Sequence, residues 1–386
     1  MRLLVPSLAA LLLCVALGPP VAIGQAPASP EEVDAAWATA DCARCHAVPG
    51  RAEEPRVRSC TTCHEWVRDV SASPKARARA LELFPDWERY ERTVHSYLPV
   101  PSLAAAMARL DPAWVSDYLA DPHDLRPRLD EGMPRFDLDA AQRAALAQAF
   151  AAARVPAPST PPPSVDNLAA GEALFTSKGC VACHGYGARH PLAPLPMAPD
   201  LAHTRARMSP DGIAAWIADP ASISPAATMP RPDLAPAEVL ALRDYIVLAD
   251  PAWQVAHTTA TLPPPTTDPV SWAQVQERVF GRICVHCHMA PELNEGRAGP
   301  GNAGGFGWAA TGIELQTRAG VMAVADKIPD ALLRRRQEVP RDVLAPGQKP
   351  ADLQRPALPG MPLGLTPIDD ADTALVLGWI AQGMPE

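Results

Sequence analysis

The sequence contains few aromatic residues, few lysines and no excess of positive charge. Aromatic residues make up 5% of its 386 residues, and only four of the 34 Lys and Arg residues are lysines. The formal net charge of −9 argues against nucleic acid as a partner, because a phosphate backbone is bound by a basic surface. No hydrophobic run after residue 24 is long enough to span a membrane, so we expect no span in the mature chain.

Proline, in contrast, is abundant, with 46 residues. Because proline interrupts helices and sheets, we expect neither long helices nor broad sheets. The composition excludes collagen, a coiled coil and a wholly disordered chain. The length of the chain suggests two or three domains rather than one.

Residues 1–24 have the pattern of a cleaved signal peptide. A short segment with Arg2 is followed by an apolar stretch at 3–17 and by the small-x-small sequence Ala22-Ile23-Gly24. An uncleaved membrane anchor is the alternative, but the apolar stretch is shorter than the roughly 20 residues that a span needs. We therefore predict export to the periplasm, and cleavage removes Cys14.

The remaining eight cysteines fall into four copies of the pattern Cys-x-x-Cys-His. Chance predicts about 0.005 copies at this content of cysteine and histidine, and the pattern is the attachment signature of c-type haem. The candidate haem-binding cysteines are Cys42 and Cys45, Cys60 and Cys63, Cys180 and Cys183, and Cys284 and Cys287. We therefore predict four covalently attached c-type haems, with iron, as the cofactors.

The spacing within each motif has a simple physical reason. Two thiols three positions apart lie on the same side of a helical turn, where both can add to the vinyl groups of one haem. The next residue then presents its imidazole to the iron. The predicted proximal ligands are His46, His64, His184 and His288.

Two other kinds of chemistry use paired cysteines. A thioredoxin-like redox site contains Cys-x-x-Cys but does not need the following histidine. Zinc would pair the motifs into sites of four cysteines, again without requiring the histidines. Neither alternative explains why a histidine follows all four pairs.

Two Pro-rich stretches, 155–166 and 258–270, are predicted to be extended, semi-rigid spacers between modules. Each module is large enough for a small core only if haem fills much of that core. The predicted order is a signal peptide at 1–24, a dihaem domain at 25–154, a second domain at 167–257 and a C-terminal domain at 271–386.

The first two modules share an internal repeat. One copy contains Pro199-Asp200-Leu201, Arg207, Asp219-Pro220 and Met229-Pro230-Arg231. The other contains Pro101-Ser102-Leu103, Arg109, Asp121-Pro122 and Met133-Pro134-Arg135, with the same spacing as far as Asp-Pro. Both copies continue with Asp-Leu and an Ala-rich stretch that is predicted to be helical. The two modules are therefore homologous units.

The order of these motifs resembles class I cytochrome c: a helix, Cys-x-x-Cys-His, Pro-x-Leu, a Trp-containing helix, Asp-Pro, Met-Pro and a final helix. The resemblance covers 167–250 completely. It extends to the third module, where 272–280 would be the first helix and 369–382 the last. It implies an all-α fold of three tandem cytochrome c-like domains, each wrapped around covalently attached haem and joined by Pro-rich linkers.

In this family the methionine before the proline is the sixth ligand of the iron and raises its reduction potential. The resemblance therefore implies that Met133, Met229 and Met361 are iron ligands. Each of the three lies in a Pro-bounded segment, whereas a methionine in an apolar helix is usually a core residue.

The first module departs from the family because it contains two haem motifs. We assign Met133 to the haem on His46, since the aromatic residue before this motif matches the family pattern. The haem on His64 then belongs to an insertion, and we expect His95 as its sixth ligand, which would give bis-His ligation. The two partners could be exchanged, and His123 or Met107 could also serve.

A haem iron with both axial positions filled has no open site for substrate, so its chemistry is outer-sphere electron transfer. We predict a periplasmic tetrahaem electron carrier with a quinol- or dehydrogenase-linked donor and a terminal acceptor. Its acidity favours redox partners with a basic docking face.

Two other functions stay open at this point. Three tandem modules resemble the cytochrome subunits of membrane-bound sugar and alcohol dehydrogenases, which would make the chain part of an oxidoreductase complex. A chain with one five-coordinate haem would resemble the dihaem peroxidases instead, and the third module would be the place for that haem.

Two further segments have unassigned roles. The Gly-rich segment 299–311 either lies close over the third haem or is a flexible surface insertion. The run Arg334-Arg335-Arg336 could dock an acidic partner or pair with haem propionates, although a charge run is usually a solvated face.

Overall fold

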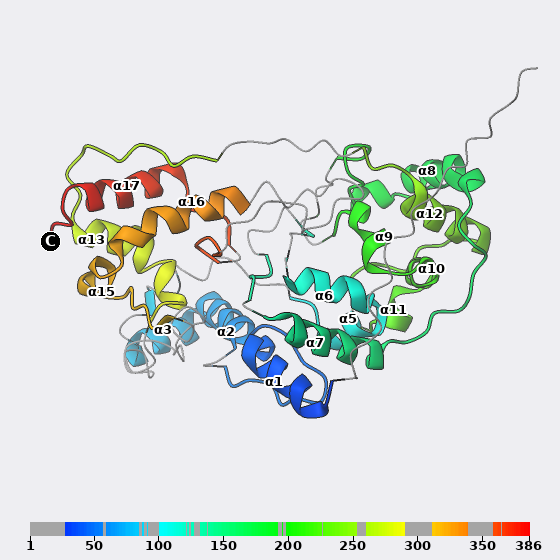
Figure 1. The fold of residues 1–386 in the computed structure, drawn as a ribbon, viewed down its shortest axis with the longest axis horizontal. Coiled ribbons are helices and arrows are strands. Elements are labelled where there is room, and N and C mark those ends of the chain that lie inside the picture. Colours follow the sequence, from blue (N-terminus) through cyan, green and yellow to red (C-terminus); the bar gives the residue numbers. More distant parts are fainter. Residues whose placement is uncertain are drawn as a thin grey trace, which may run out of the picture.

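The computed structural model is helical, with no strand element among the residues that it describes (Figure 1). This agrees with the predicted all-α class. The described residues are 28–56, 59–84, 87–88, 91, 100–120, 122, 125–126, 132–136, 138–191, 195, 198–225, 227–252, 260–289, 311–338, 358–363 and 365–386. Their buried side chains form four separate hydrophobic clusters.

The first cluster is enclosed by α1 (Pro30–Ala40), α5 (Leu103–Arg109), α6 (Pro112–Ala120) and α7 (Ala140–Ala153). α1 begins in a capping box, in which the side chains of Ser29 and Glu32 accept from each other's backbone N–H groups. Its buried face carries Trp37 and packs against α7. The Ala-rich stretch at the end of the first module is therefore helical, as predicted, and forms α7.

The second cluster lies among α8 (Leu168–Ser177), α9 (Thr204–Arg207), α10 (Pro210–Ala218), α11 (Pro220–Ile223) and α12 (Pro236–Leu248). α8 and α12 cross at Gly171, where an added Cβ would overlap the carbonyl oxygen of Ala241. Glycine at this position therefore lets α8 and α12 pack closely, whereas a side chain would force the two helices apart. Phe175 and Tyr245 fill the core beside this crossing.

The third cluster is formed by α13 (Trp272–Val275), the π-helical turn Gln276–Phe280, α15 (Arg318–Met322), α16 (Ile328–Glu338) and α17 (Asp370–Ala381). The expected helices at 272–280 and 369–382 correspond to α13 with its π turn and to α17. Trp379 on α17 is fully buried, and its ring centroid lies 5.5 Å from that of Trp272. The first and last helices of this module therefore meet through aromatic rings.

The fourth cluster belongs to a helical pair inside the first module, α2 (Cys60–Ala72) and α3 (Pro74–Leu83). Its centre is Trp87, which is fully buried and lies edge-on to Trp66 at 5.3 Å between ring centroids. The cluster also contains Val67 and Ala80. The segment around the second haem motif therefore has a core of its own.

The same helix pairing recurs in all three modules. The helix before the haem motif packs against the last helix of its module: α1 on α7, α8 on α12, and α13 with its π turn on α17. In Figure 1, α13 and α15–α17 lie at one end of the molecule and α8–α12 at the other, with α1, α5, α6 and α7 between them. The first module therefore lies between the other two.

The Pro-rich segment 155–166 has no helix or strand as far as Ser164 and then enters the 3₁₀ turn Val165–Asn167, and it is not a free spacer. Thr160 donates its backbone N–H to Asp211 of α10 at 2.9 Å, and the carbonyl of Pro161 accepts from Arg243 of α12 at 2.9 Å. Asp244 accepts from the backbone N–H of Ser164 at 3.2 Å. The segment is therefore a strap across the second module.

Two charged side chains in α12 hold this strap. Arg243 and Asp244 are each 1% exposed, and they form an ion pair with each other. Arg243 also donates to the hydroxyl of Thr160 and the carbonyl of Pro161, and Asp244 also accepts from the backbone N–H of Ser164. Both buried charges therefore have hydrogen-bond partners in the strap as well as each other. The sequence alone gives no signal for this, because adjacent Arg and Asp residues on a helix usually face solvent.

The second Pro-rich segment, 258–270, is held in a similar way where the structure describes it. Thr266 donates its backbone N–H to the carbonyl of Ala374 at 3.1 Å, and Gln382 accepts from the backbone N–H of Val270 at 3.0 Å. The absence of a Cβ at Gly378 lets α17 approach Thr266. Both segments therefore belong to the modules that follow them.

None of the described helices is long and apolar enough to cross a membrane. Residues 1–24, the predicted signal peptide, lie outside the described residues.

Replacing Asp244 by alanine is expected to lower the free energy of unfolding by about 3–5 kcal/mol, because Arg243 is then buried without its counter-charge. Chemical unfolding of the haem-loaded protein, followed by circular dichroism, measures the loss. The control is Glu172→Ala, which removes one member of the exposed Arg189–Glu172 pair and should change stability little. Equal effects of the two variants would contradict a structural role for the buried pair.

Candidate functional site

Three of the four Cys-x-x-Cys-His motifs adopt the same backbone turn. Their cysteines begin the short 3₁₀ turns Cys42–Arg44, Cys180–Ala182 and Cys284–His286. In each turn the backbone N–H of the histidine donates to the carbonyl of the first cysteine, at 2.8, 2.9 and 3.0 Å in chain order. The three motifs therefore present their thiols and imidazole in the same local conformation.

The imidazole of each of these histidines is held by one backbone carbonyl. Nδ1 of His46 lies 2.8 Å from the carbonyl oxygen of Pro101, and Nδ1 of His184 lies 2.9 Å from that of Pro199. In the third module the carbonyl belongs to Ile313, at 3.3 Å from Nδ1 of His288. A carbonyl only accepts, so Nδ1 carries the proton and Nε2 keeps its lone pair for a metal.

The electrostatic environment favours the same protonation state. Burial lowers the pKa of His46, His184 and His288, and the carbonyl hydrogen bond opposes this effect only in part. The three side chains are therefore held as neutral imidazoles, which is the form that binds a metal ion.

A second backbone bond fixes the carbonyl in place. Leu103 and Leu201, two residues after the two prolines, donate their N–H groups to the residues that follow His46 and His184, at 3.0 Å each. Leu315 makes the corresponding bond to the carbonyl of His288 at 2.8 Å. The segment Ile313–Leu315 is therefore the third module's counterpart of Pro-x-Leu.

This counterpart was missed in the sequence because it lacks the proline. The histidine and the accepting carbonyl are separated by 55, 15 and 25 residues in the three modules, so spacing gives no guide either. The longest of these separations, in the first module, contains the second haem motif with α2 and α3. The structure thus shows that motif as an insertion between His46 and its carbonyl.

The second motif has a different conformation. Cys60 is the first residue of α2, and Ser59 caps the helix by accepting from the N–H of Thr62 at 3.2 Å. Cys63 packs against the fourth hydrophobic cluster beside Trp66. The motif therefore lies in the first turn of a regular helix rather than in a separate 3₁₀ turn.

All eight cysteines of the motifs are free of disulfide bonds. Burial raises the pKa of Cys42 and Cys63 to about 11 and that of Cys284 to about 12, so these thiols are not activated nucleophiles. Unreactive thiols at these three positions are suited to covalent attachment of haem more than to disulfide exchange.

Cysteines of three motifs approach one another. Cys45 and Cys60 are hydrogen-bonded through their side chains, which raises the pKa of Cys45 and lowers that of Cys60. Cys287 lies close enough to interact electrostatically with Cys60 and with Arg44. These cysteines bring the first, second and fourth motifs close together, although Cys45 and Cys287 belong to different modules.

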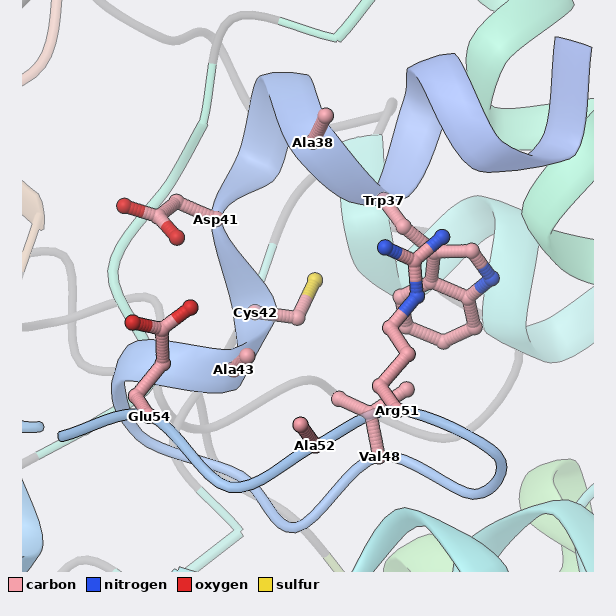
Figure 2. A pocket seen from close by; sticks show the side chains of 9 residues that line it. All are labelled: Trp37, Ala38, Asp41, Cys42, Ala43, Val48, Arg51, Ala52 and Glu54. Atoms are coloured by element: carbon pink, nitrogen blue, oxygen red, sulfur yellow. The ribbon is translucent and has the colours of Figure 1, made fainter. Parts of the chain in front are cut away.

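A cavity of about 470 Å³ lies beside Cys42. Its lining comprises Trp37, Ala38, Asp41, Cys42, Ala43, Val48, Arg51, Ala52 and Glu54, and Figure 2 shows the Cys42 sulfur turned towards Trp37 and Ala38. Ligand and cofactor sites typically have volumes of about 300–1,000 Å³ and mostly apolar linings with a few polar groups. The space next to this cysteine is therefore large enough for a cofactor.

Of the predicted sixth ligands, Met133 packs against the first hydrophobic cluster, which also contains Trp37 and Cys42. Met229 is half-buried in a segment closed by an ion pair between Arg231 and Asp219 at 3.5 Å. His95 and His123 lie outside the described residues, and Met107 is buried in the first core. Met107 thus has the packing of an ordinary core methionine.

Met361 is held by α16. Its backbone N–H donates to the carbonyl of Ala331 at 2.9 Å, and the N–H of the preceding Gly360 donates to Glu338 at 2.8 Å. The arginine run of α16 binds the same part of the chain: Arg335 donates to the carbonyl of Leu365 at 2.6 Å and Arg336 to that of Ile368 at 3.0 Å. The run therefore positions the Met361 segment and is not a solvated face.

The residues fit a haem better than a metal ion bound by protein alone. Among the described residues, no group of three or more His, Cys, Asp or Glu side chains is arranged to hold a metal ion. Haem needs only one or two axial protein ligands, because the porphyrin supplies the other four. The neutral imidazoles and the paired thiols meet that requirement, and the cavity beside Cys42 lies next to one of these thiols.

Comparison with known protein families finds a match for the second module. A family model described as Cytochrome c matches residues 168–249, which run from the start of α8 to just beyond α12. No curated protein and no solved structure matches the chain. The matched segment supports a c-type cytochrome, a family that binds c-type haem covalently and transfers electrons.

Asp200 fixes the loop that carries the carbonyl partner of His184. Its buried carboxylate accepts from the N–H groups of Gly187 at 3.1 Å and Ala202 at 2.8 Å. Asp200→Ala leaves both donors unpaired and is expected to lower the free energy of unfolding by about 1–3 kcal/mol. Thermal unfolding of the haem-loaded protein measures this.

Asp200→Asn keeps one accepting oxygen and should retain more of the stability than the alanine variant. The exposed Asp233 serves as the control, since Asp233→Ala should have little effect. If Asp200→Ala proves as stable as Asp233→Ala, the carboxylate does not hold this loop.

Proposed function

We propose that the chain is a periplasmic tetrahaem cytochrome c that carries out outer-sphere electron transfer between redox partners. The observation that carries the proposal is the recurrence of one histidine–carbonyl geometry at three motifs, of which only the one at Cys180 lies in the matched segment. The same local structure at the other two motifs supports the same cofactor there. The remaining motif, the second along the chain, has the same Cys-x-x-Cys-His pattern but begins the helix α2 at Cys60.

Each haem is held by residues of this chain. The paired cysteines attach the porphyrin, and a neutral histidine beside them supplies a nitrogen ligand to the iron. Bound haem supplies a centre that is oxidised and reduced by one electron without making or breaking bonds. The protein orients the imidazole through its carbonyl partner and surrounds the site with an apolar cluster.

The same observations support a domain organisation. We propose three tandem cytochrome c-like domains at 25–154, 167–257 and 271–386, after a signal peptide at 1–24. Four hydrophobic clusters, each with a cysteine of one motif packed in or against it, support one haem for each cluster. The second haem then occupies an insertion in the first domain.

The convergence of three motifs supports a relay. Electron transfer between centres becomes slower as they move apart, so haems must lie near one another to pass electrons in sequence. The hydrogen-bonded thiols of Cys45 and Cys60, with Cys287 nearby, bring three attachment points together. We propose that the haem on His46 is the central one of the relay.

The sixth ligands differ among the four haems in this proposal. Met133, Met229 and Met361 serve the haems on His46, His184 and His288, because Met133 packs on the cluster of Trp37 and α16 holds Met361 in a fixed position. His95 serves the haem on His64. The donor is a quinol- or dehydrogenase-linked protein with a basic docking face, since the chain carries a net charge of −9.

Intact mass measurement tests the number of haems. The chain, expressed with haem-maturation machinery, is expected to lose residues 1–24 and to gain four haems. Replacing both cysteines of any one motif by alanine should remove one haem. Cys14→Ala is the matched control and should leave the mature mass unchanged, and a wild-type mass with three haems or fewer would contradict the proposal.

Single methionine variants test the sixth ligands. Met361→Ala is expected to abolish the thioether-to-iron absorption band of one oxidised haem and to lower its reduction potential, because a thioether stabilises ferrous iron. The control is Met322→Ala, at a position in the same module that is 39% exposed. Met133→Ala and Met229→Ala should have the same effects on the haems on His46 and His184, respectively.

If Met361→Ala and Met322→Ala give the same spectrum, the third module does not use Met361. A high-spin signal from that module in the wild-type protein would then favour an enzyme with an open haem, which is the peroxidase alternative. Stable co-purification with a dehydrogenase would favour the subunit alternative instead of a free carrier.

A further inference from the structure

In the third module the segment that leads into α17 packs on α16, and the two helices lie beside each other in Figure 1. Gly360 is buried in this contact, and an added Cβ would overlap the backbone nitrogen of Arg335. The absence of a side chain therefore lets the segment lie directly on the backbone of α16. The next residue, Met361, donates its N–H to the carbonyl of Ala331 at 2.9 Å. The backbone of the proposed ligand is thus fixed against the helix.

Arginines of α16 hold this segment on both sides of Met361. Arg334 donates to the carbonyl of Pro359 at 3.3 Å, before the methionine. Arg335 donates to the carbonyl of Leu365 at 2.6 Å, after it. Consecutive residues of an α-helix point about 100° apart, so these two donors leave the helix in different directions. The segment is therefore held around the helix and not at a single point.

Glu338, the last residue of α16, binds the same segment. Its carboxylate accepts from the N–H of Gly360 at 2.8 Å and forms an ion pair with Arg335 at 3.4 Å. The side chains of Arg335 and Glu338 are 15% and 18% exposed, so water screens this pair only in part. An acid in the last turn of a helix is disfavoured by the helix dipole, and its two partners offset that cost here.

Arg335 and Glu338 thus act on one turn of the chain from both ends. Glu338 binds the residue before Met361, and Arg335 binds the chain four residues after it. Their own ion pair joins the two contacts. We call the pair Arg335–Glu338, with its contacts to Gly360 and Leu365, the α16 clamp.

The clamped segment shares a core with the haem motif of its module. Leu332 on α16 and Ile368 after the clamped turn are both buried in the third hydrophobic cluster. Cys284, the first cysteine of the motif, packs against the same cluster. A movement of the clamped segment would therefore disturb the core in which the haem is proposed to lie.

The contact beside the corresponding methionine of the second module is more exposed. Near Met229, Arg231 pairs with Asp219 at 3.5 Å, and the arginine side chain is 72% exposed. Exposed ion pairs contribute little, because water and salt screen them and the side chains lose entropy. The half-buried contacts of the clamp are therefore expected to hold Met361 more firmly than this pair holds Met229.

We infer that Arg335 and Glu338 are positioning residues, which keep Met361 on the iron of the haem on His288 and close that haem to other ligands. The inference rests on the proposed function, since it needs this haem and this sixth ligand. An external ligand binds the iron only after the Met361 segment has moved away, and that movement breaks the clamp. Its affinity is therefore reduced in proportion to the rarity of the open form. The clamp acts against an open haem in the third module.

Imidazole binding to the full, oxidised, haem-loaded chain tests this, because imidazole competes with a thioether for ferric iron. Glu338→Ala and Arg335→Ala are each expected to raise the imidazole affinity of one haem about tenfold, which corresponds to the loss of one hydrogen bond to a charged group. That haem is the one whose thioether-to-iron band disappears in Met361→Ala. Glu338→Gln keeps an oxygen for the N–H of Gly360 and should retain part of the wild-type resistance to imidazole.

Two control variants match these changes. Asp330 is exposed in the first turn of α16, so Asp330→Ala removes the same charge from the same helix without touching the clamp. It should bind imidazole as the wild type does. Arg231→Ala removes an arginine beside the methionine of the second module and should also have little effect. A tenfold rise at the haem on His184 in Arg231→Ala would overturn the argument that the burial of the clamp gives it its effect.

The outcomes separate this inference from the proposed function. The number of haems is measured on the same samples, and fewer than four in the wild type would overturn the proposed function. An unchanged spectrum of Met361→Ala would overturn the proposed ligand and the clamp together.

The clamp alone is overturned in two cases in which Met361→Ala does change the spectrum. In the first, Glu338→Ala binds imidazole no more tightly than Asp330→Ala. In the second, the affinity rises at a haem that Met361→Ala does not affect. If Glu338→Ala fails to fold, Glu338→Gln provides the same comparison, because it still loses the ion pair with Arg335.

Discussion

The hydrogen bond from an imidazole Nδ1 to one backbone carbonyl is the interaction on which the rest of this structure depends. It fixes the tautomer of the histidine, leaves Nε2 available to iron, and ties the haem motif to a loop that is 15 to 55 residues away in sequence. The helix before the motif and the last helix of the module then pack around this point. The fold is thus built around the imidazoles that we propose as iron ligands.

Small cores explain the rest of the architecture. Each cluster contains at most twelve buried residues, and the first Pro-rich segment crosses its module as a strap held by the buried Arg243 and Asp244. A covalently attached haem would add the largest apolar body to each core. The first module lies between the other two, so its two motifs are placed where contacts with both neighbours meet.

The candidate cysteines and histidines could be predicted from the sequence, because covalent attachment of haem needs the fixed Cys-x-x-Cys-His spacing, which occurs four times. The helical class and the helices that correspond to α13 with its π turn and to α17 followed from the resemblance to class I cytochrome c. Ile313 as a carbonyl partner, the docking of the Pro-rich segments and the contacts of Arg335 and Glu338 with the Met361 segment did not follow. These depend on backbone carbonyls or on contacts between distant segments, for which residue identity gives little signal.

Near-infrared magnetic circular dichroism of the fully oxidised protein tests the central claim most directly, because it distinguishes His–Met from bis-His ligation at low-spin haem. Three equivalent modules and one insertion predict three His–Met haems and one bis-His haem, all low-spin. Fewer than three His–Met haems, or a five-coordinate high-spin haem, would contradict the view that the same ligand geometry is repeated in all three modules.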